Sequence, residues 1–453
     1  MAVPLMQPET SEQRPPAASR FRTWLRTLGA SLLRPIVAII FAFIAGAIVI
    51  LITWPDKTVD PFTNVIHAYT TLFTGSYGTL PNLSNTLVQV IPLTLASLSV
   101  AIAFRAGLFN IGAAGQLAAG GTVADMIGLT HQSWPAWLLV PTMILAGMAT
   151  GAALGGIVGF LKAWRGAHEV VTTIMLNWII FWSSDYIINS KPFVTPFGTP
   201  ETKVLPNNAQ LPSLAALSNQ LFHTQFNTFL YTVDVSIFLV LIAVVVYWFL
   251  ISRTTFGYEL RVVGQNQQAA RYAGIPIKRT ILLVMLISGA FSGLAGALNL
   301  MGQPGYNLSA TAYSQLPTGF DAIAVALLGN TSAIGVLISA LFLGGLRSGT
   351  TEMQAVAHVD PNLVLIIEAL VLFFIAAEFI PVIRRHLPSW MRSRRSPVLV
   401  SSELGQPAFV LSEIPNGDEG DQEINGNSGT DGQTGYSGDG QDEYGSANPG
   451  KEQ

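Results

Sequence analysis

The chain has 453 residues, of which 50% are apolar and only 11% charged, and its mean hydropathy is +0.47. Soluble domains carry roughly 25% charged residues, so these values exclude a water-soluble protein and indicate an integral membrane protein. The absence of cysteine excludes disulfides, thiolate metal sites and a cysteine nucleophile. The net charge of −3 is unevenly distributed: residues 1–401 hold 22 bases and 15 acids, whereas residues 402–453 hold eleven acids and one base.

Apolar segments long enough to cross a bilayer recur along the chain. The first follows a basic arm, 1–34, that is too long for the start of a signal peptide, so we expect an uncleaved first span. All these segments are predicted to be helices, because a spanning backbone must satisfy its own hydrogen bonds. They lie at 35–53, 84–104, 107–128, 135–161, 171–188, 233–252, 280–301, 317–346 and 362–383. The predicted fold class is all-α: a polytopic membrane protein with about 8–10 transmembrane helices, including broken or re-entrant segments.

Two of these segments contain signals for a break. The 317–346 run is interrupted by Gly329, Asn330, Thr331 and Ser332, and we expect two half-length helices that enter and return. The 107–128 run is rich in glycine and alanine and is a second candidate. Four glycines at 147, 151, 155 and 159, and a pair at 289 and 293, are spaced for close helix packing, which we expect to be intramolecular.

Charge placement predicts the orientation. With a cytoplasmic N-terminus, the inner segments hold eighteen Lys and Arg before the tail, and the outer ones hold four: Lys57, Lys191, Lys203 and Arg347. This positive-inside asymmetry predicts a multi-pass membrane protein with both termini in the cytoplasm. We expect a cytoplasmic arm at 1–34, a transmembrane domain at 35–385, a basic juxtamembrane segment at 386–401 and a disordered acidic tail at 402–453.

Signatures of catalysis are missing from the sequence. It contains no G-x-x-x-x-G-K-[ST] phosphate loop and no G-x-S-x-G elbow. His168-Glu169 begins like a zinc-protease helix, but Thr172 stands where the second histidine belongs. We therefore predict a non-catalytic protein that holds no cofactor or metal and binds no nucleic acid.

Polar and aromatic residues inside the apolar segments are the candidates for a solute pathway. Amides and acids at membrane depth are costly unless they pair or face a cavity. Hydrogen bonding between helices remains an equal alternative for the amides, and a helix-dipole role is an equal alternative for the acid. The candidates are Phe109, Asn110, Gln116, Asn177, Trp178, Phe320 and Asp321.

The loop at 256–275 is predicted to contain a short helix outside the membrane. Asn266 is a plausible N-cap, QQAARYA favours two helical turns, and Gly274 is a plausible stop. So short a helix is unstable alone, so we expect it either to dock on a partner or to be a simple connector. The candidate docking residues are Gly264, Asn266, Ala269, Ala270, Arg271, Tyr272, Ala273 and Gly274.

Four motifs in order resemble the permease subunits of bacterial ABC importers, in the nucleoside-type branch of the family that includes ribose and branched-chain amino-acid permeases. They are FNIGAAGQ at 109–116, HEVVTTIMLNW at 168–178, GxNxxAARYAGI at 264–275 and GFDAIAVALLGN at 319–330. The resemblance covers about 35–385, and it implies that this region is a transmembrane permease domain of the bacterial plasma membrane. It departs from the family at Ala114, where many relatives carry glutamate, and in the acidic tail.

The resemblance implies a non-catalytic subunit that moves a small solute by alternating access. It also implies cytoplasmic ABC ATPase subunits that use the ATP, a second permease subunit, and an extracellular binding lipoprotein of the basic-membrane-protein type. Nucleosides are the expected solute. A simple sugar or branched-chain amino acid carried by the same machinery is one alternative, and an ion-coupled secondary transporter is another. An amino acid is less favoured, because the acids Asp185, Asp321 and Glu368 have no evident basic partner in the spans.

Overall fold

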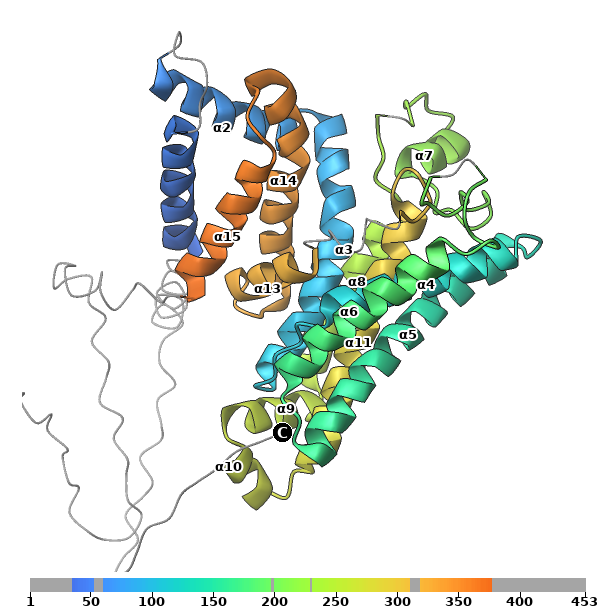
Figure 1. Cartoon of the computed structure of the whole chain (residues 1–453), viewed down its shortest axis with the longest axis vertical. Helices are drawn as coiled ribbons and strands as arrows, with labels where there is room; N and C mark the ends of the chain where they lie inside the picture. Colours follow the sequence, from blue (N-terminus) through green and yellow to red (C-terminus); the bar gives the residue numbers. More distant parts are fainter. Residues whose placement is uncertain (1–34, 53–59, 197–198, 229, 310–317, 377–453) are drawn as a thin grey trace, which may run out of the picture. The chain divides into compact units, whose positions relative to one another are not determined.

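The computed structural model describes residues 35–52, 60–196, 199–228, 230–309 and 318–376. The predicted arm at 1–34, juxtamembrane segment at 386–401 and tail at 402–453 lie outside these ranges. Within them every regular element is a helix, and only isolated β-bridges occur, which confirms the all-α prediction (Figure 1). The helices are Pro35–Ile52, α2 (Pro61–Tyr77), α3 (Leu80–Arg105), α4 (Ala113–Thr130), α5 (Ala136–Arg165), α6 (Glu169–Ile188), α7 (Leu214–Phe222), α8 (Ser236–Arg253), α9 (Thr255–Gln265), α10 (Gln267–Tyr272), α11 (Ile277–Gly302), α13 (Thr318–Leu328), α14 (Ala333–Ala357) and α15 (Asn362–Ala376).

Among the described residues, seven helices are long and apolar enough to cross a membrane: Pro35–Ile52, α3, α5, α6, α8, α11 and α14. All but α14 coincide with a predicted apolar run. The helix α2 was not predicted, because its sequence mixes polar and apolar residues. Asp60 caps its N-terminus: the Asp60 carboxylate accepts a hydrogen bond from the Thr63 backbone N–H at 3.2 Å. The Tyr69 hydroxyl fastens α2 to the first span by donating to the Phe43 carbonyl at 2.7 Å.

The interrupted segment differs from the prediction. α13 is a half-length helix that ends at Leu328, but α14 continues for 25 residues and is a full span. The prediction of two half-length helices was therefore wrong for the second one. The prediction placed the end of the apolar run before Arg347. In the structure this arginine lies within α14 and is paired with carboxylates. Arg347 accordingly belongs to a span and not to an outer segment.

The break near residue 107 lies before the helix and not within it. α3 ends at Arg105, residues 106–112 are not helical, and α4 then runs without interruption. Gly107 adopts a φ of +69°, which an L-residue with a side chain rarely adopts. The short irregular segment lets the chain reverse between two buried helices.

The glycine-rich faces of α5 and α11 contact each other. A Cβ on Gly151 would overlap the Gly289 carbonyl oxygen, and a Cβ on Gly293 would overlap the Gly147 carbonyl oxygen. A Cβ on Gly155 would likewise overlap the Met285 carbonyl oxygen. The two predicted glycine patterns thus form one intramolecular crossing, as expected, in which the backbones approach as closely as small residues permit.

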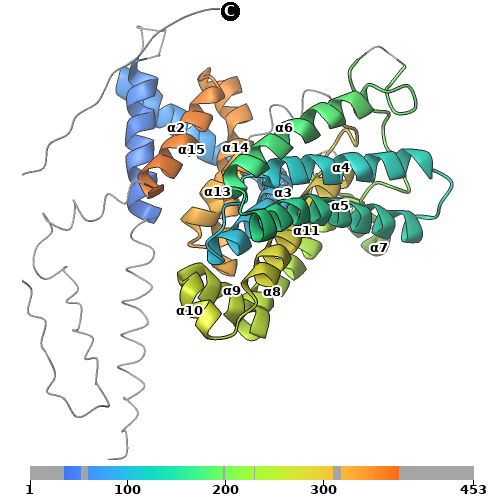
Figure 2. The ribbon, with the colours of Figure 1, turned by 60° about the horizontal axis from the view of Figure 1, so that its bottom comes forward.

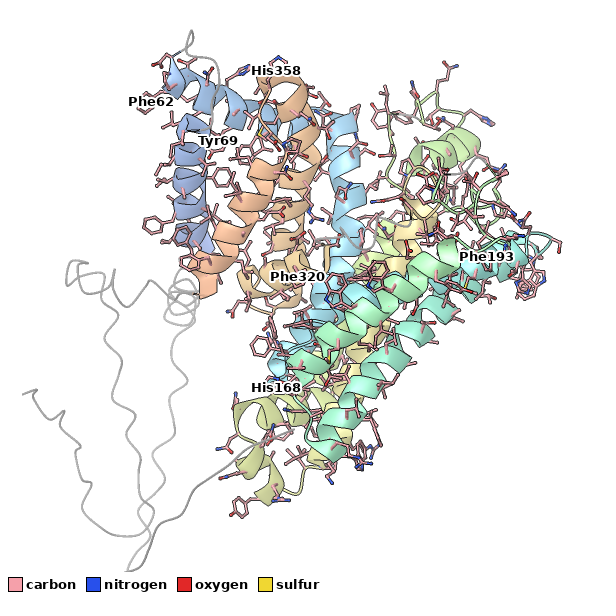
Figure 3. All side chains as sticks on the ribbon, viewed as in Figure 1. Phe62, Tyr69, His168, Phe193, Phe320 and His358 are labelled. Atoms are coloured by element: carbon pink, nitrogen blue, oxygen red, sulfur yellow. The ribbon has the colours of Figure 1, made fainter. Side chains whose placement is uncertain are left out.

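The two ends of the bundle are occupied by different elements. α9 and α10 lie at one end, and α7 with the long loop 189–235 lies at the other (Figures 1 and 2). The loop is held over the end of α11 by backbone hydrogen bonds from Thr202 to Leu308, from Leu205 to Tyr306 and from Leu211 to Met301. His168, at the start of α6, lies at the α9 end, and His358, after α14, lies at the opposite end (Figure 3).

Candidate functional site

The two predicted amides of the 107–121 segment form a closed hydrogen-bonded cluster. Asn110 is fully buried and donates to Gln116 Oε1 at 2.9 Å and to Ser288 Oγ at 2.7 Å, while Gln116 donates back to Asn110 Oδ1 at 3.2 Å. Ser288 in turn donates to the Ser99 carbonyl at 2.7 Å. The cluster therefore joins α3, the start of α4 and α11, which is the geometry of interhelical hydrogen bonding.

Asn177 helps to cap the N-terminus of α4. Its Oδ1 accepts from the Gly115 N–H at 2.9 Å, and its Nδ2 donates to the Ile111 carbonyl at 3.0 Å. The cap of α4 is Gly112, which has no side chain to satisfy the exposed N–H groups. Asn177, supplied by α6 and 5% exposed, satisfies one of them instead.

The predicted aromatic residues are exposed, unlike the amides. Phe109, Trp178 and Phe320 are 51%, 55% and 56% exposed, respectively. Phe109 stacks edge-on against Phe104 at 5.0 Å between ring centroids. Phe320 lies on α13 near the middle of the bundle (Figure 3). Next to it in the chain, Gly319 packs against Ala114, where a Cβ on the glycine would overlap the alanine.

Asp321 belongs to a buried ion cluster that extends over three helices. Its carboxylate on α13 pairs with the Arg347 guanidinium of α14, and Arg347 Nε lies 3.6 Å from Glu368 Oε1 on α15. Arg347 also donates to the Thr318 hydroxyl at 3.2 Å. The expectation that Asp321 and Glu368 have no basic partner was wrong, because the partner was assigned to an outer segment. Charges at membrane depth are retained where they pair with one another.

Arg347 also lines a polar cavity between α3 and α14. The cavity has a volume of about 400 Å³ and is lined mainly by amide, hydroxyl and charged side chains, including Asn82, Asn85, Gln89, Gln303, Arg347 and Ser348. A second, larger cavity of about 700 Å³ lies among the loops at the α7 end and is lined by residues such as Gln210, Ser213 and Tyr306. Thr232 and Pro304 line both cavities, so the two adjoin.

The predicted short helix is confirmed as α10. Asn266 caps it by accepting from the Gln268 and Ala269 N–H groups at 2.9 and 3.1 Å, and Gly274 follows with a φ of +74°. Ala269, Arg271, Tyr272 and Ala273 are exposed. Ala270 differs from the expectation: it is fully buried within its own subunit and presents no surface to a partner.

Gly264 links this end of the molecule to the bundle. A Cβ on Gly264 would overlap the Arg105 carbonyl oxygen and would lie 2.9 Å from the carbonyl carbon of Ala106. Arg105 Nε donates to the Thr331 carbonyl at 3.0 Å, in the turn between α13 and α14, and the Tyr247 hydroxyl donates to the same oxygen at 2.7 Å. The short helices, the end of α3 and the α13–α14 turn therefore meet at one junction.

Comparison with known proteins identifies the family. Residues 82–376 match the family described as branched-chain amino acid transport system / permease component. The chain belongs to this family and is a permease component of an ABC transporter, as its four motifs predicted. No group of three or more metal-ligating side chains gathers among the described residues.

Three relatives align with most of the chain. It is 37% identical to the guanosine ABC transporter permease protein NupP of Bacillus subtilis, over 77% of this chain and 94% of the relative. It is 36% identical to the nucleoside ABC transporter permease protein NupB of Lactococcus lactis, over 76% and 91%. It is 32% identical to the glucose ABC transporter permease protein TsgB13 of Haloferax volcanii, over 76% and 87%.

Sequence reasoning missed the cavity and its arginine. Gln89 lies inside an apolar run and Arg347 directly follows one, and both positions carry the signal of a polar group at membrane depth. Arg347 was overlooked because the run was assumed to end at it. Asn85, Gln303 and Ser348 gave no signal, since polar residues near the ends of spans are common.

Proposed function

We propose that this chain is the membrane-spanning subunit of an ABC importer for nucleosides. The observation that carries the proposal is the similarity, over most of the chain, to permeases named for guanosine and nucleoside transport. The cavity beside Arg347 supports it, because amides and hydroxyls suit the hydrogen-bonding edges of an uncharged base and ribose. A volume of about 400 Å³ lies within the roughly 300–1,000 Å³ of small-molecule sites.

The importer is assembled from several subunits in this proposal. Cytoplasmic ATPase subunits bind and hydrolyse ATP, and this chain is a non-catalytic transport subunit that holds no cofactor. A second permease subunit and an extracellular binding lipoprotein of the basic-membrane-protein type complete it. Both termini face the cytoplasm of a bacterial cell, and α10 lies on that side. The orientation rests on the placement of lysine and arginine.

Coupling to ATP is proposed to begin at the exposed face of α10. Closure of the ATPase subunits presses on Ala269, Arg271, Tyr272 and Ala273, with Asn266 and Gly274 fixing the two ends of the helix. The displacement of α10 is transmitted through Gly264 to the end of α3, and from there to the α13–α14 turn, because Arg105 donates a hydrogen bond to Thr331. α13 and α14 carry Asp321 and Arg347, so movement there changes the cavity wall.

The remaining predicted pathway residues are proposed to have two different roles, one for the aromatic residues and one for the amides. The exposed rings of Phe109, Trp178 and Phe320 are proposed to face the second permease subunit or the pathway between the two subunits. The buried amides Asn110, Gln116 and Asn177 hold the helices that present those rings.

Uptake of labelled solutes tests the proposal. The complete importer is expressed in a strain without nucleoside uptake, and cells are given radiolabelled guanosine, adenosine, uridine, glucose, ribose or leucine. We expect ATP-dependent accumulation of nucleosides, and none with an ATPase subunit that cannot hydrolyse ATP. Accumulation of leucine alone, or transport by this chain without its partners, contradicts the proposal.

Glucose is the second candidate, because of the similarity to TsgB13 at 32% identity. The cavity wall has hydroxyl and amide groups that also suit a sugar, and the described residues that line it include no aromatic ring. Uptake of labelled guanosine is measured with and without unlabelled glucose. A reduced guanosine signal means that glucose shares the pathway, and an unchanged signal means that it does not.

A further inference from the structure

The wall of the 400 Å³ cavity combines a cation with neutral hydrogen-bonding groups. Arg347 lies beside Gln89, Asn85, Gln303 and Ser348, and its side chain is 17% exposed. An arginine offers five N–H donors in a fixed plane, which suits oxygen atoms of a solute. An unpaired arginine in such a place attracts anions, such as phosphate groups.

The charge of this arginine is balanced from the side away from the cavity wall. Asp321 pairs with one end of the guanidinium, Glu368 lies 3.6 Å from Nε, and neither acid is among the residues that line the cavity. With both acids ionised, the three groups carry a formal net charge of −1. Glu352, which also lines the cavity, adds a further negative charge. The cavity thus offers hydrogen-bond donors without a net positive charge.

The position of the cavity makes it reachable from the end of the bundle that holds α7. Thr232 and Pro304 line both this cavity and the 700 Å³ cavity, and the Thr232 hydroxyl donates to Asn85 Oδ1 at 2.7 Å.

We infer that the cavity between α3 and α14 is the solute site within the membrane, and that Asp321 and Glu368 make it select uncharged solutes over anions. The acids act by cancelling the charge of Arg347, so they position and neutralise it without touching the solute. The inference rests on the proposed import function. It adds that a nucleoside is accepted and a nucleoside monophosphate is refused at this cavity.

The absence of cysteine provides a direct test. Gln89→Cys places a single thiol in the cavity wall, and Ala216→Cys places one in the outer cavity as the matched control. Intact cells expressing the importer are treated with a cationic or an anionic methanethiosulfonate, and the labelling rates are compared. We expect the cationic reagent to be faster at Gln89→Cys, and guanosine to slow labelling there but not at Ala216→Cys.

Neutralising one acid should then change the selectivity. Asp321→Asn in the Gln89→Cys background is expected to raise the ratio of anionic to cationic labelling roughly tenfold, because one unit of negative charge near the site is lost. Glu368→Gln provides the second variant, should Asp321→Asn lower the amount of protein in the membrane. The Ala216→Cys ratio should stay unchanged in both.

Two results overturn the inference: an unchanged ratio at a labelled Gln89→Cys in both acid variants, or no labelling of this thiol from outside. The failure of the proposed nucleoside function looks different. In that case the uptake panel shows no nucleoside transport, the charge-dependent ratio still shifts, and glucose rather than guanosine slows the labelling of Gln89→Cys.

Discussion

Two helix groups on either side of α3 are held together in opposite ways. The α4–α5–α11 group is packed through glycines whose backbones touch, and its polar groups pair in a closed cluster. The α13–α14–α15 group is joined by an arginine and two acids, and it borders a cavity. The first arrangement leaves no room for a side chain between the backbones, whereas the second borders open space. From this comparison we expect a rigid side, α4–α5–α11, and a movable side, α13–α14–α15.

The ion cluster should be the most sensitive point. Arg347→Gln leaves Asp321 and Glu368 buried without a cation, and breaking a buried ion pair in this way typically costs about 3–5 kcal/mol. We expect a large loss of thermal stability of the purified protein, together with loss of uptake. Arg253→Gln, an exposed arginine at the end of α8, is the control and should change little. A stable Arg347→Gln protein would mean that the acids are already protonated or hydrated.

Adjacent glycines on α5 provide a matched pair for the rigid side. In Gly155→Ala the new Cβ overlaps the Met285 backbone carbonyl, which cannot yield, and overpacking of this kind costs about 1–3 kcal/mol. In Gly156→Ala the nearest atom is the tip of the Leu286 side chain at 2.7 Å, which can rotate away. Melting curves of the two variants should therefore separate. Equal curves would show that the crossing is looser than the backbone contacts indicate.

The amide cluster should be less sensitive than either of these. Asn110→Leu removes its bonds to Gln116 and Ser288, and interhelical hydrogen bonds in membrane proteins average about 0.6 kcal/mol. A loss of about 1 kcal/mol in stability is expected, with Ser183→Ala, whose hydroxyl bonds only within α6, as the control. If uptake falls while stability is unchanged, Asn110 contacts the solute and the cluster is not purely structural.

The smallest effect on stability is expected at α10, where neither kind of packing operates. Ala269→Glu changes an exposed residue and should alter stability by less than about 0.5 kcal/mol. It should nevertheless abolish uptake and co-purification of the ATPase subunit, because the acid would be buried against the partner. Ala270→Glu should instead unfold its own helix end, because Ala270 is fully buried. If the Ala269→Glu protein still co-purifies with the ATPase subunit, the coupling surface is not the exposed face of α10.

The rigid side was largely predictable from the sequence. Spacing alone predicted that Gly151 and Gly293 make intramolecular helix contacts. Outside this side, the cap at Asn266 followed from local chemistry in the same way. These features depend on short stretches whose geometry is fixed by the helix itself, although the spacing did not show that α5 and α11 are the two helices that meet.

The movable side was not predictable in the same way. Arg347 is separated by 26 residues from Asp321 and by 21 from Glu368, so their pairing depends on how three helices are arranged. By hydropathy, an isolated arginine after an apolar run is assigned to the end of a span, and the predicted topology put that end outside. Only its acidic partners show that it lies within a span. Outside this side, the roles of Asn110 in the amide cluster and of Ala270 in α10 also depended on burial, which a single sequence does not reveal.

Pro92 interrupts the backbone hydrogen bonding of α3. It lies within the helix, between Gln89 at the cavity and Ser97 and Ser99 toward the amide cluster, and it has no N–H to bond to the carbonyl one turn earlier. The helix can therefore bend more easily at this residue. After Pro92, the Ser99 carbonyl accepts from Ser288 of α11; before it, Asn85 and Gln89 line the cavity. A bend of a few degrees at Pro92 would tilt Asn85 and Gln89 relative to Arg347 while leaving the glycine crossing untouched.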